Sequence, residues 1–587
     1  MAWTIDNKEQ AINPYNFVTL TKTIEREKAV KGPLSGVISC RLITKTPLAI
    51  PDTGEMTLER TNDSERKEEH KSFPFFSIGE KKIIPGSELR GMIRAAFEAV
   101  TCSCMGVINS NTLSARHPTP RKPGLIRWNI DAGKWELYDA VKKDSDAGGA
   151  VKHNWYCING RVRGSSRCNR KRNGRFECRN RQNKRCSGKA RYYLKEEEAI
   201  LLSKNVAEEL NKAVEEFNND EGIMAIYLKN DKDKYEKDKY ENVAYRIKDD
   251  GKWYVVFYEE VKNGAIYLSP AQISRSVFRK RLEDLIGDLK TCGHASLENK
   301  GLCPACRLFG MISKSCCIGG SVRFGDAELA EVGKDGLKYA TLKELAEPKP
   351  SSVEFYTQKP EGAKFWNYDY KVTKYDKAND PERFLCDVEL NGRKFYLHHK
   401  TPAYKSSEKT KRNSTMELIP EDSEFKFDIW FDQLDKGQLN ELLWILTFGE
   451  NSLNGIKWHK IGHGKPIGLG SIKIAVDSIK TRTVTVSNGL VLRDEDKEEF
   501  PEVNPFTSQG YVDLEHIAKT RYDRVGYPLG DGGASARNNR YASHQWFIGN
   551  RMIRAKNSMQ PVISRTLPLV RDGSEAAKLS LPKHKRV

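Results

Sequence analysis

The sequence predicts an α+β fold built on a split βαβ sheet of the ferredoxin-like or RNA-recognition type, interrupted by large insertions. Two segments far apart, 36–44 and 424–431, alternate apolar and polar residues as half-buried strands do. An amphipathic helical pattern follows over 87–100 and 439–446, and another strand pattern covers 472–476. Strands and helices in this order are typical of a split βαβ unit.

The composition is typical of a globular protein. Of 587 residues, 38% are hydrophobic, 9% aromatic and 30% charged, a balance that excludes an intrinsically disordered chain. No apolar run approaches the roughly 18 residues that cross a bilayer, and the first residues lack an apolar secretory core. The thirteen cysteines are therefore expected as thiols or metal ligands in a cytoplasmic chain.

The positive charge is concentrated in two segments. The net charge is +19, but residues 161–191 alone carry thirteen Lys or Arg against one acid, and residues 519–587 carry fourteen against four. The remainder is close to neutral. This distribution predicts two basic appendages that contact a polyanion, or, alternatively, two solvated basic loops.

The N-terminal part of the fold holds a strand, a charged loop and a helix. After the strand at 36–44, the loop at 52–76 has abundant charge without apolar periodicity and is expected to project from the body. In the helix at 87–100, apolar residues recur at i, i+3, i+4 and i+7, and Ser87 is the expected N-cap. Arg90 and Arg94, one turn apart, share another face.

Two long segments interrupt the fold. Residues 101–290 include an arginine- and cysteine-rich stretch at 157–191, a helix expected near 194–217 and a hairpin-like region near 226–260. A shorter insertion covers 360–415. The predicted units are therefore 1–100, 101–290, 291–359, 360–415, 416–480 and 481–587.

Four residues form two close pairs of metal ligands separated by eight residues: Cys292, His294, Cys303 and Cys306. Tetrahedral zinc takes four N or S donors, and two pairs on short turns supply them at little entropic cost. We expect one structural zinc here and no catalysis by it, because four protein ligands leave no open coordination position. The alternative is a set of buried thiols beside an exposed histidine.

Other cysteines form weaker ligand sets. The arginine-rich stretch holds four at irregular spacing, without a C-x-x-C pair: Cys157, Cys168, Cys178 and Cys186. A second zinc would order this stretch, which has few apolar residues, and four free thiols are the alternative. A last group, either a ligand set or reduced core cysteines, comprises Cys102, Cys104, Cys316 and Cys317.

A glycine-rich loop precedes the last strand of the fold. It runs Gly462-His463-Gly464-Lys465-Pro466-Ile467-Gly468-Leu469-Gly470, and Lys460 stands just before it. Glycines allow close approach of the backbone to a ligand, and lysines neutralise phosphate. The order G-x-x-x-x-G-K-[ST] is absent, so the loop does not indicate nucleotide hydrolysis.

The C-terminal segment interleaves aromatic and basic residues between 527 and 554, including Arg537 and Arg540. Rings between cations suit single-stranded RNA, which makes these arginines candidate RNA ligands. An equal alternative is that the aromatic residues pack on the body or on a neighbouring subunit.

Four motifs in order resemble those of the RAMP superfamily, the RNA-binding proteins of CRISPR effector complexes. The opening motif is Ile84-Pro85-Gly86-Ser87-Glu88-Leu89-Arg90-Gly91-Met92-Ile93-Arg94, and the glycine-rich loop is the closing motif. Between them, Cys303-Pro304-Ala305-Cys306-Arg307-Leu308-Phe309-Gly310 and Val322-Arg323-Phe324-Gly325-Asp326-Ala327 are similar to motifs of type III backbone subunits. The stretches 348–356 and 392–399 are similar to a type III-D-associated branch of large, insertion-bearing members.

The resemblance implies a fold, a function and partners. The fold would be a modified ferredoxin-like domain with a zinc module at 291–359, a thumb-like loop at 52–76 that interrupts a guide–target duplex, and a basic C-terminal extension at 481–587. The chain would bind CRISPR guide RNA for pairing with target RNA, beside the large, small and further backbone subunits of a prokaryotic cytoplasmic complex. The expected RNA contacts are Ser87, Arg90, Arg94, Lys460, Gly462, His463, Gly464, Lys465, Gly468, Gly470, Arg163, Arg170, Arg172, Arg175, Arg537 and Arg540.

Related RNA-cleaving subunits keep a catalytic acidic residue in the loop before the opening helix. In the usual register this chain has His70-Lys71-Ser72-Phe73-Pro74, without an aspartate. Asp52 and Asp63 lie upstream, and a lengthened loop would bring either one, with Mg²⁺ and assistance from His70, to a bound target. The alternative is that both are solvated acids. Two rival functions stay open: a stand-alone metal-dependent endoribonuclease that processes CRISPR RNA, and a zinc-stabilised structural adaptor.

Overall fold

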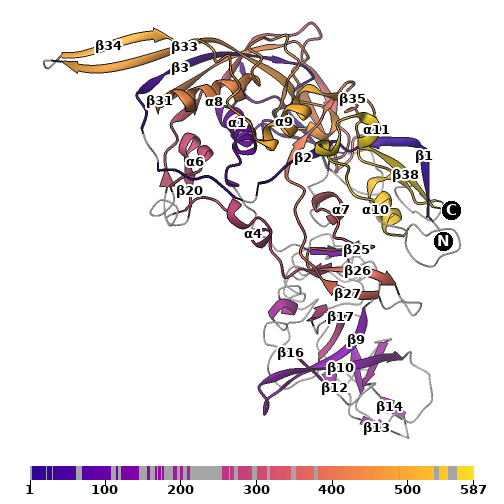
Figure 1. Cartoon of the computed structure of the whole chain (residues 1–587). Coiled ribbons are helices and arrows are strands. Elements are labelled where there is room, and N and C mark those ends of the chain that lie inside the picture. The colour runs from indigo at the N-terminus through magenta and orange to yellow at the C-terminus, as the bar shows by residue number, and fades with distance from the viewer. Residues whose placement is uncertain are drawn as a thin grey trace.

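The computed structural model has a large antiparallel sheet, called the central sheet here, at the top of the view in Figure 1. It describes residues 3–21, 23–28, 31–60, 69–106, 114–116, 121–143, 155–158, 166–167, 170–172, 175–177, 190–194, 199–202, 208–211, 254–262, 265–269, 275–293, 301–313, 317–345, 352–375, 381–487, 490–533, 541–552 and 565–586.

The central sheet follows the predicted split βαβ order. Strand β3 (Leu34–Thr44) lies between β31 (Glu424–Leu434) and β33 (Ser471–Ser487), and both pairings are antiparallel. The strands that complete the sheet are β32 (His459–Lys460), β23 (Ala327–Glu331), β7 (Lys81–Ile84), β6 (Ser77–Ile78), β22 (Val322–Phe324) on β31, and β34 (Leu490–Lys497) on β33. The expected α+β fold class is confirmed. The predicted domain boundary at 480 falls inside β33.

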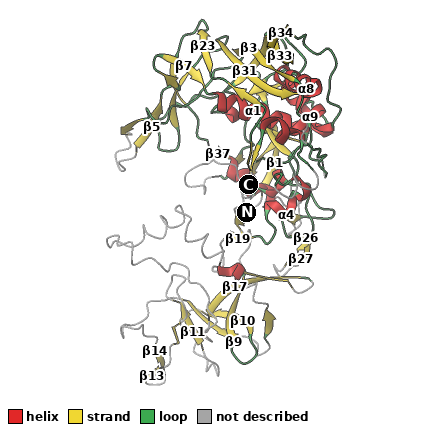
Figure 2. Cartoon of the chain, turned by 90° about the vertical axis from the view of Figure 1, so that its left-hand side faces the viewer, coloured by secondary structure: helices red, strands yellow, loops and turns green. Residues whose placement is uncertain are grey.

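Two helices cover one face of this sheet: α1 (Gly86–Val100) and α8 (Lys436–Thr447) (Figures 1 and 2). The leucine stripe of α8 and the inward residues of β31 are fully or almost fully buried against each other, as their periodicities predict. Asp435 caps α8 by accepting a hydrogen bond from the Gln438 N–H at 2.8 Å. Helix α9 (Gln509–Lys519) packs against α1.

The start of α1 differs from the prediction. The helix begins at Gly86, and Ser87 lies in its first turn without a capping hydrogen bond. The cap comes instead from the link between β22 and β23, because Asp326 accepts a hydrogen bond from the Gly86 N–H at 2.8 Å. A carboxylate here is favoured by the helix dipole. A Cβ at position 86 would lie 2.2 Å from the Phe324 carbonyl oxygen, so only glycine permits this approach.

The charged loop at 52–76 forms part of a projecting ribbon (Figure 2). Strand β4 (Thr57–Arg60) pairs antiparallel with β5 (Glu69–Phe73), and β5 pairs in parallel with β30 (Ser414–Leu418). Strand β24 (Lys338–Thr341) completes this sheet on the other side of β30. The ribbon is therefore anchored by a segment more than three hundred residues away, which the sequence pattern did not indicate.

The chain ends form a separate small sheet rather than a loose tail. Strand β38 (Ser580–Arg586) pairs antiparallel with β1 (Trp3–Ile12), and β36 (Gly530–Asp531) and β37 (Tyr541–Ala542) extend the sheet. Helix α10 (Ser543–Met552) packs on it through Trp546, whose fully buried ring stacks on His584 with centroids 4.6 Å apart. Tyr527 and Phe547 join the same apolar cluster. For these residues the packing alternative is the correct one.

Parts of the two insertions form one lobe, below the central sheet in both views (Figures 1 and 2). The larger insertion contributes β9 (Lys122–Asn129), β10 (Lys134–Lys143), β11 (Trp155–Ile158), β12 (Ser166–Arg167), β15 (Ala190–Leu194), β16 (Ile200–Leu202), β17 (Tyr254–Val261) and β18 (Ala265–Ser269). The smaller one contributes β25 (Phe365–Trp366), β26 (Tyr370–Tyr375) and β27 (Pro381–Leu385). Buried Glu259 joins them, since it accepts hydrogen bonds from Arg121 at 2.6 Å and Tyr370 at 2.7 Å.

The helix expected near 194–217 is wrong at its start, because residues 200–202 pair with β10 as strand β16. Within 194–217, the structure describes helical residues only at 208–211. Of the region near 226–260, residues 226–253 lie outside the described part, and β17 pairs with β9 and β18.

The remaining elements are short. The strand pairs are β2 (Tyr15–Val18) with β28 (Arg393–Tyr396), β8 (Ser114–Arg116) with β19 (Arg275–Val277), β13 (Arg170–Arg172) with β14 (Arg175–Glu177), β20 (Met311–Ile312) with β21 (Cys317–Ile318), and β29 (His398–His399) with β35 (Arg521–Tyr522). The helices are α4 (Leu282–Leu285), η2 (Gly287–Leu289), α6 (Pro304–Phe309), α7 (Val353–Tyr356), η3 (Lys465–Ile467), η4 (Val570–Asp572) and α11 (Ala576–Leu579). Within the described residues, no helix has the length and apolar character needed to span a membrane.

Candidate nucleic-acid interface and metal centre

The opening motif and the glycine-rich loop line one cavity of about 570 Å³. Helix α1 contributes Ser87, Gly91 and Ala95 to its wall, and the glycine-rich loop contributes Gly462 and Lys465. Strand β28 and helix α9 complete it with mainly apolar side chains. Two segments that are distant in sequence thus face each other across a space of ligand size.

The glycine-rich loop is a tight structure in which four glycines have positive φ. The φ angles of Gly462, Gly464, Gly468 and Gly470 are 76°, 76°, 98° and 74°. At Gly470 a Cβ would lie 1.9 Å from the Ile461 carbonyl oxygen, so a side chain is excluded by contact as well as by conformation. In the described part of the chain, the N–H groups of Gly464 and Lys465 donate no hydrogen bond.

Two lysines of this loop are desolvated without a carboxylate partner among the described residues. Lys460 donates to the Leu469 carbonyl at 2.9 Å, and Lys465 donates to the Gly462 carbonyl at 2.5 Å. Burial, together with the charge of Lys465, lowers the pKa of Lys460 to about 7. Burial also lowers the pKa of Lys465. Each ammonium group therefore lacks an ion-pair partner among the described residues, and the charge of Glu88 only partly offsets the effect of burial on Lys465.

Two further cations lie on aromatic rings at this cavity. The Lys394 ammonium lies 4.1 Å from the centre of the Tyr15 ring, and burial lowers the pKa of Lys394 to about 8. The Arg521 guanidinium lies 3.3 Å from the centre of the Trp458 ring, and burial lowers the pKa of Arg521 to about 10. Lys394 and Trp458 both line the cavity. The sequence analysis missed both cations, and the stretch 392–399 was the only signal near one of them.

Arg90 and Arg94 lie on a different face of α1. Arg94 donates to Glu98 at 2.8 Å and to the Gly310 carbonyl at 3.0 Å. Arg90 donates to the Phe309 carbonyl. Both guanidinium groups therefore satisfy the C-terminal carbonyls of α6, and neither residue lines the cavity.

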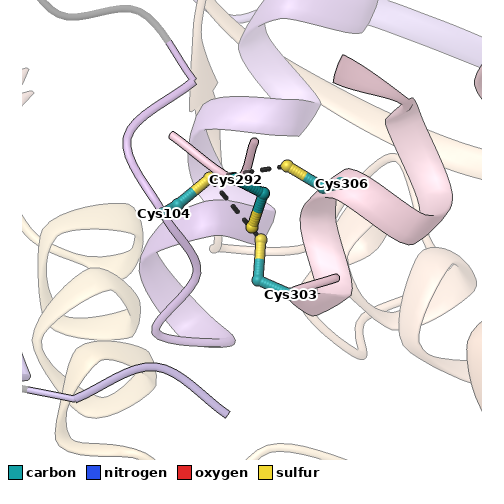
Figure 3. Close-up of side chains that lie close together, drawn as sticks. All are labelled: Cys104, Cys292, Cys303 and Cys306. Atoms are coloured by element: carbon teal, nitrogen blue, oxygen red, sulfur yellow. Dashed lines mark hydrogen bonds between the residues drawn. The ribbon is translucent and has the colours of Figure 1, made fainter. Parts of the chain in front are cut away.

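Four buried cysteines meet where α1 and α6 approach each other (Figure 3). Cys303 and Cys306 come from the start of α6, Cys292 precedes that helix, and Cys104 follows the end of α1. The Cys104 sulfur lies 3.4 Å from that of Cys306 and 3.6 Å from that of Cys303. All four sulfurs lie within 4.8 Å of one another.

This donor set fits a tetrahedral metal ion such as zinc. With Zn–S bonds of about 2.3 Å, the sulfurs of a tetrahedral site are about 3.8 Å apart, close to the separations seen here. Hydrogen bonds hold the Cys104 backbone in place, since Arg393 donates to its carbonyl at 3.0 Å. Hydrogen bonding among the four thiols lowers the pKa of Cys292 and Cys303 and raises the pKa of Cys104 and Cys306, so the sulfur separations, and not the ionisation of one thiol, indicate the metal site.

Three of the four predicted ligands belong to this cluster, and the fourth sulfur is that of Cys104. His294 lies outside the described residues. The signal that could have found Cys104 is the Cys102-Ser103-Cys104 sequence directly after the helix, which places a thiol at the helix end. Cys102 itself has a left-handed φ of 53° and is not part of the cluster.

A comparison with known proteins gives a family match over part of the chain. Residues 275–473 match the model of the RAMP superfamily. This part of the chain is similar to RAMP proteins. The matched residues run from β19 to β33 and include three cluster cysteines and the glycine-rich loop, whereas α1 and Cys104 lie outside them.

Other comparisons add little to this match. One similar solved chain belongs to the "Cryo-EM structure of the Type III-B Cmr-beta bound to cognate target RNA". It is 9% identical, the alignment covers 75% of the present chain and 96% of that chain, and the TM-score is 0.16. No curated protein matches. The fold assignment therefore rests on the family match and on the strand order.

The remaining candidate residues are spread widely along the chain. Asp63, Arg163, Arg537 and Arg540 lie outside the described residues, as do Cys168, Cys178 and Cys186. Arg170, Arg172 and Arg175 belong to the hairpin of β13 and β14, at the far end of the insertion lobe from α1 in both views (Figures 1 and 2). His463 lies in the glycine-rich loop, and its N–H donates to the Ala49 carbonyl at 2.8 Å.

Of the candidate catalytic residues, the structure describes Asp52 and His70, both at the base of the ribbon. One carboxylate oxygen of Asp52 accepts a hydrogen bond from the Gly54 N–H at 3.0 Å, within a local turn. His70 is fully buried, with Nδ1 2.9 Å from the Thr410 carbonyl and Nε2 2.9 Å from the Thr415 hydroxyl. Both ring nitrogens of His70 are therefore engaged in holding the ribbon.

Proposed function

We propose that this chain is a RAMP protein that serves as an RNA-binding backbone subunit of a type III CRISPR effector complex and holds guide RNA for pairing with target RNA. The observation that carries the proposal is the cavity between α1 and the glycine-rich loop, where half-buried cations have no ion-pair partner in the described part of the chain.

Desolvated lysines of this kind favour an anionic ligand. Keeping the half-buried Lys460 and Lys465 charged costs free energy that an ion pair would recover. RNA phosphates supply that negative charge, and free N–H groups at Gly464 and Lys465 supply donors for phosphate oxygens. The ligand is therefore expected to raise the pKa values of both lysines when it binds.

The apolar part of the cavity suits a nucleotide better than a free anion. Trp458, Phe395 and Tyr396 line it beside the cations. Aromatic rings stack with any base, whereas an inorganic phosphate gains nothing from them. Recognition of this kind is independent of base sequence, which is the property needed when the guide itself selects the target.

Assignment to a type III complex rests on the resemblance of the four motifs and agrees with the superfamily match. The implied partners are guide RNA, target RNA and other subunits of the effector. The cysteine cluster would hold a structural metal ion that fixes α6 against the end of α1, with no catalytic step assigned to it.

The test is a titration of the assembled effector, or of the full-length chain, with guide RNA at several salt concentrations. The Lys460→Ala/Lys465→Ala variant should bind at least tenfold more weakly and lose roughly 0.7 from the salt slope for each phosphate contact removed. Lys457→Ala is the matched control, because Lys457 lies near the same loop but is paired with Glu515 at 2.8 Å.

Three results would contradict the proposal. Equal affinity and slope in the double variant and the control would remove the cavity from RNA binding. Cutting of repeat RNA by the purified chain alone would favour the stand-alone endoribonuclease. Absence of RNA from the purified native complex would favour a structural adaptor.

A further inference from the structure

The face of the central sheet opposite α1 and α8 carries an exposed tryptophan. Along β31, Phe427, Ile429 and Phe431 are buried toward the helices, while Trp430 is 50% exposed on the other face. Strand β31 is interior to the sheet, between β3 and the strands β22 and β23. A single exposed apolar residue needs no explanation by itself, so the meaning of Trp430 depends on its neighbours.

Trp430 stands in a row of side chains that crosses five strands. The register pairs Trp430 with Arg323 of β22 on one side and with Val37 of β3 on the other. Val37 pairs in turn with Lys480 of β33, and Lys480 pairs with Lys497 of β34. Directly paired residues point to the same face of a sheet. The three cations therefore share the face of Trp430.

These three cations are exposed on the sheet face. Arg323, Lys480 and Lys497 form no ion pair with a carboxylate within the described part of the chain. The carboxylates on this face are mostly engaged elsewhere, since Asp477 binds Arg41 at 2.8 Å and Asp432 accepts from Ser35 at 2.6 Å. Asp428 and Asp432 both stand two residues from Trp430 on β31, and Asp428 is half-buried.

Gly325 leaves room for the Trp430 indole ring to lie on the sheet. A Cβ at Gly325 would lie 3.0 Å from Cζ3 and 3.2 Å from Cη2 of Trp430, so glycine at this position leaves the space that the ring occupies. Gly325 is fixed there, since its N–H donates to the Asp428 carbonyl at 2.9 Å. It belongs to the motif Val322–Ala327, whose Asp326 caps α1. No aromatic ring or cation stacks on Trp430 among the described residues.

We propose that this sheet face binds a segment of single-stranded RNA, with one base stacked on Trp430 and neighbouring phosphates on Arg323, Lys480 and Lys497. RNA-recognition sheets use an aromatic side chain on an interior strand in this way, and flanking cations neutralise the backbone. The strand order of the central sheet makes β31 the corresponding strand. The site is distinct from the cavity, because it lies on the opposite face of the sheet from α1.

The experiment is photo-crosslinking of the full-length chain to a single-stranded oligouridine that contains 5-iodouridine, with the crosslinked residue found by mass spectrometry. The crosslink is expected on Trp430. Trp430→Ala should weaken oligouridine binding about tenfold or more, and Trp430→Phe should restore most of it, because a phenyl ring still stacks. Tyr339→Ala is the matched control, since Tyr339 is 59% exposed and pairs with Glu417 rather than standing in a cationic row.

Equal oligouridine binding by Trp430→Ala and Tyr339→Ala, with crosslinks only at other residues, would overturn the proposal. Protection of Trp430 from oxidation by a protein subunit alone, without RNA, would also overturn it and assign the face to protein docking. Melting curves of each variant verify folding. The crosslink should persist in Lys460→Ala/Lys465→Ala, so failure of the cavity proposal and failure of the sheet-face proposal give different results.

Discussion

The two faces of helix α1 use positive charge in opposite ways. On the face toward α6, Arg94 pairs with Glu98 at 2.8 Å, and both Arg90 and Arg94 donate to carbonyls at the end of α6. On the face toward the glycine-rich loop, Lys460 and Lys465 donate only to loop carbonyls and have no carboxylate partner among the described residues. The two arginines have fixed partners within the protein, whereas the two lysines have no ion-pair partner among the described residues.

This difference shows why a basic residue inside a family motif is an incomplete sign of ligand binding. A guanidinium group with fixed partners stabilises the fold and has little capacity left for a ligand. A buried ammonium group without a counter-charge raises the free energy of the free protein, and an anion relieves that cost. The partners of a cation therefore indicate its role better than its motif does.

The largest effect is expected from the cysteine cluster, which joins the first face of α1 to α6. Cys104→Ser should abolish stoichiometric zinc and lower Tm by about 10 °C or more, because structural zinc supplies much of the folding free energy of small modules. Cys102→Ser is the control, since Cys102 is close in sequence but outside the cluster. Elemental analysis and thermal melting measure both effects, and equal zinc content in the two variants would exclude Cys104 as a ligand.

The next effect compares folding stability with RNA affinity for an arginine on the face of α1 toward α6. Arg94→Ala should lower the free energy of unfolding by about 2 kcal/mol, because it removes charged hydrogen bonds to Glu98 and Gly310. Guide RNA affinity should change less than twofold in conditions where the variant is folded. Denaturant unfolding and RNA titration test this pair of outcomes. A large loss of affinity at unchanged stability would mean that Arg94 contacts RNA directly and that the contrast between the faces is wrong.

A third effect concerns pH at the cavity. The pKa of Lys460 is lowered from 10.5 to about 7, so its contribution to stability is greatest above pH 10.5 and is lost as pH falls toward 7. RNA favours the protonated form, and affinity should therefore fall by up to about tenfold per pH unit above 7. Lys460→Met should flatten this dependence. RNA titrations at pH 6 to 9 check it, and an identical pH profile in the variant would show that Lys460 does not bind the phosphate.

The smallest effect concerns the ribbon, where Asp52 and Asp63 are the candidates for metal-assisted cleavage. Labelled target RNA is given to the assembled complex with Mg²⁺, and the cuts of wild type, Asp52→Ala and Asp63→Ala are compared. If this subunit cleaves, one specific cut disappears while target binding is retained. Survival of every cut in the double variant would restrict the subunit to holding RNA. Glu59→Ala is the control, as Glu59 is another ribbon acid, paired with Lys409 at 2.6 Å.

Local sequence pattern was sufficient to predict the strands and helices of the central sheet, but not those of the insertion lobe. The predicted strands at 36–44 and 424–431 are contained in β3 and β31, because alternate residues had to be apolar to cover α1 and α8. The helix predicted near 194–217 begins instead with strands, since residues 200–202 pair with a strand sixty residues earlier. A pairing partner of this kind leaves no trace in the periodicity of the segment itself.

In the candidate sites, too, residues close in sequence could be predicted and residues distant in sequence could not. Cys292, Cys303 and Cys306 could be found from spacing, because close pairs in sequence are close pairs in space. Spacing could not assign Cys104 to the same cluster, because about two hundred residues separate it from its partners. Only the packing of α1 against α6 brings them together. Asp326 as the cap of α1 was missed for the same reason.

By itself the sequence determined the order of strands and helices, the flexible glycine-rich loop and the concentration of charge, all of which depend on local composition and periodicity. The tertiary structure decided which cations have partners, which cysteine completes the cluster, and which aromatic side chain stays exposed on the sheet. These properties depend on distances between segments remote along the chain, and such distances are set only when the elements pack.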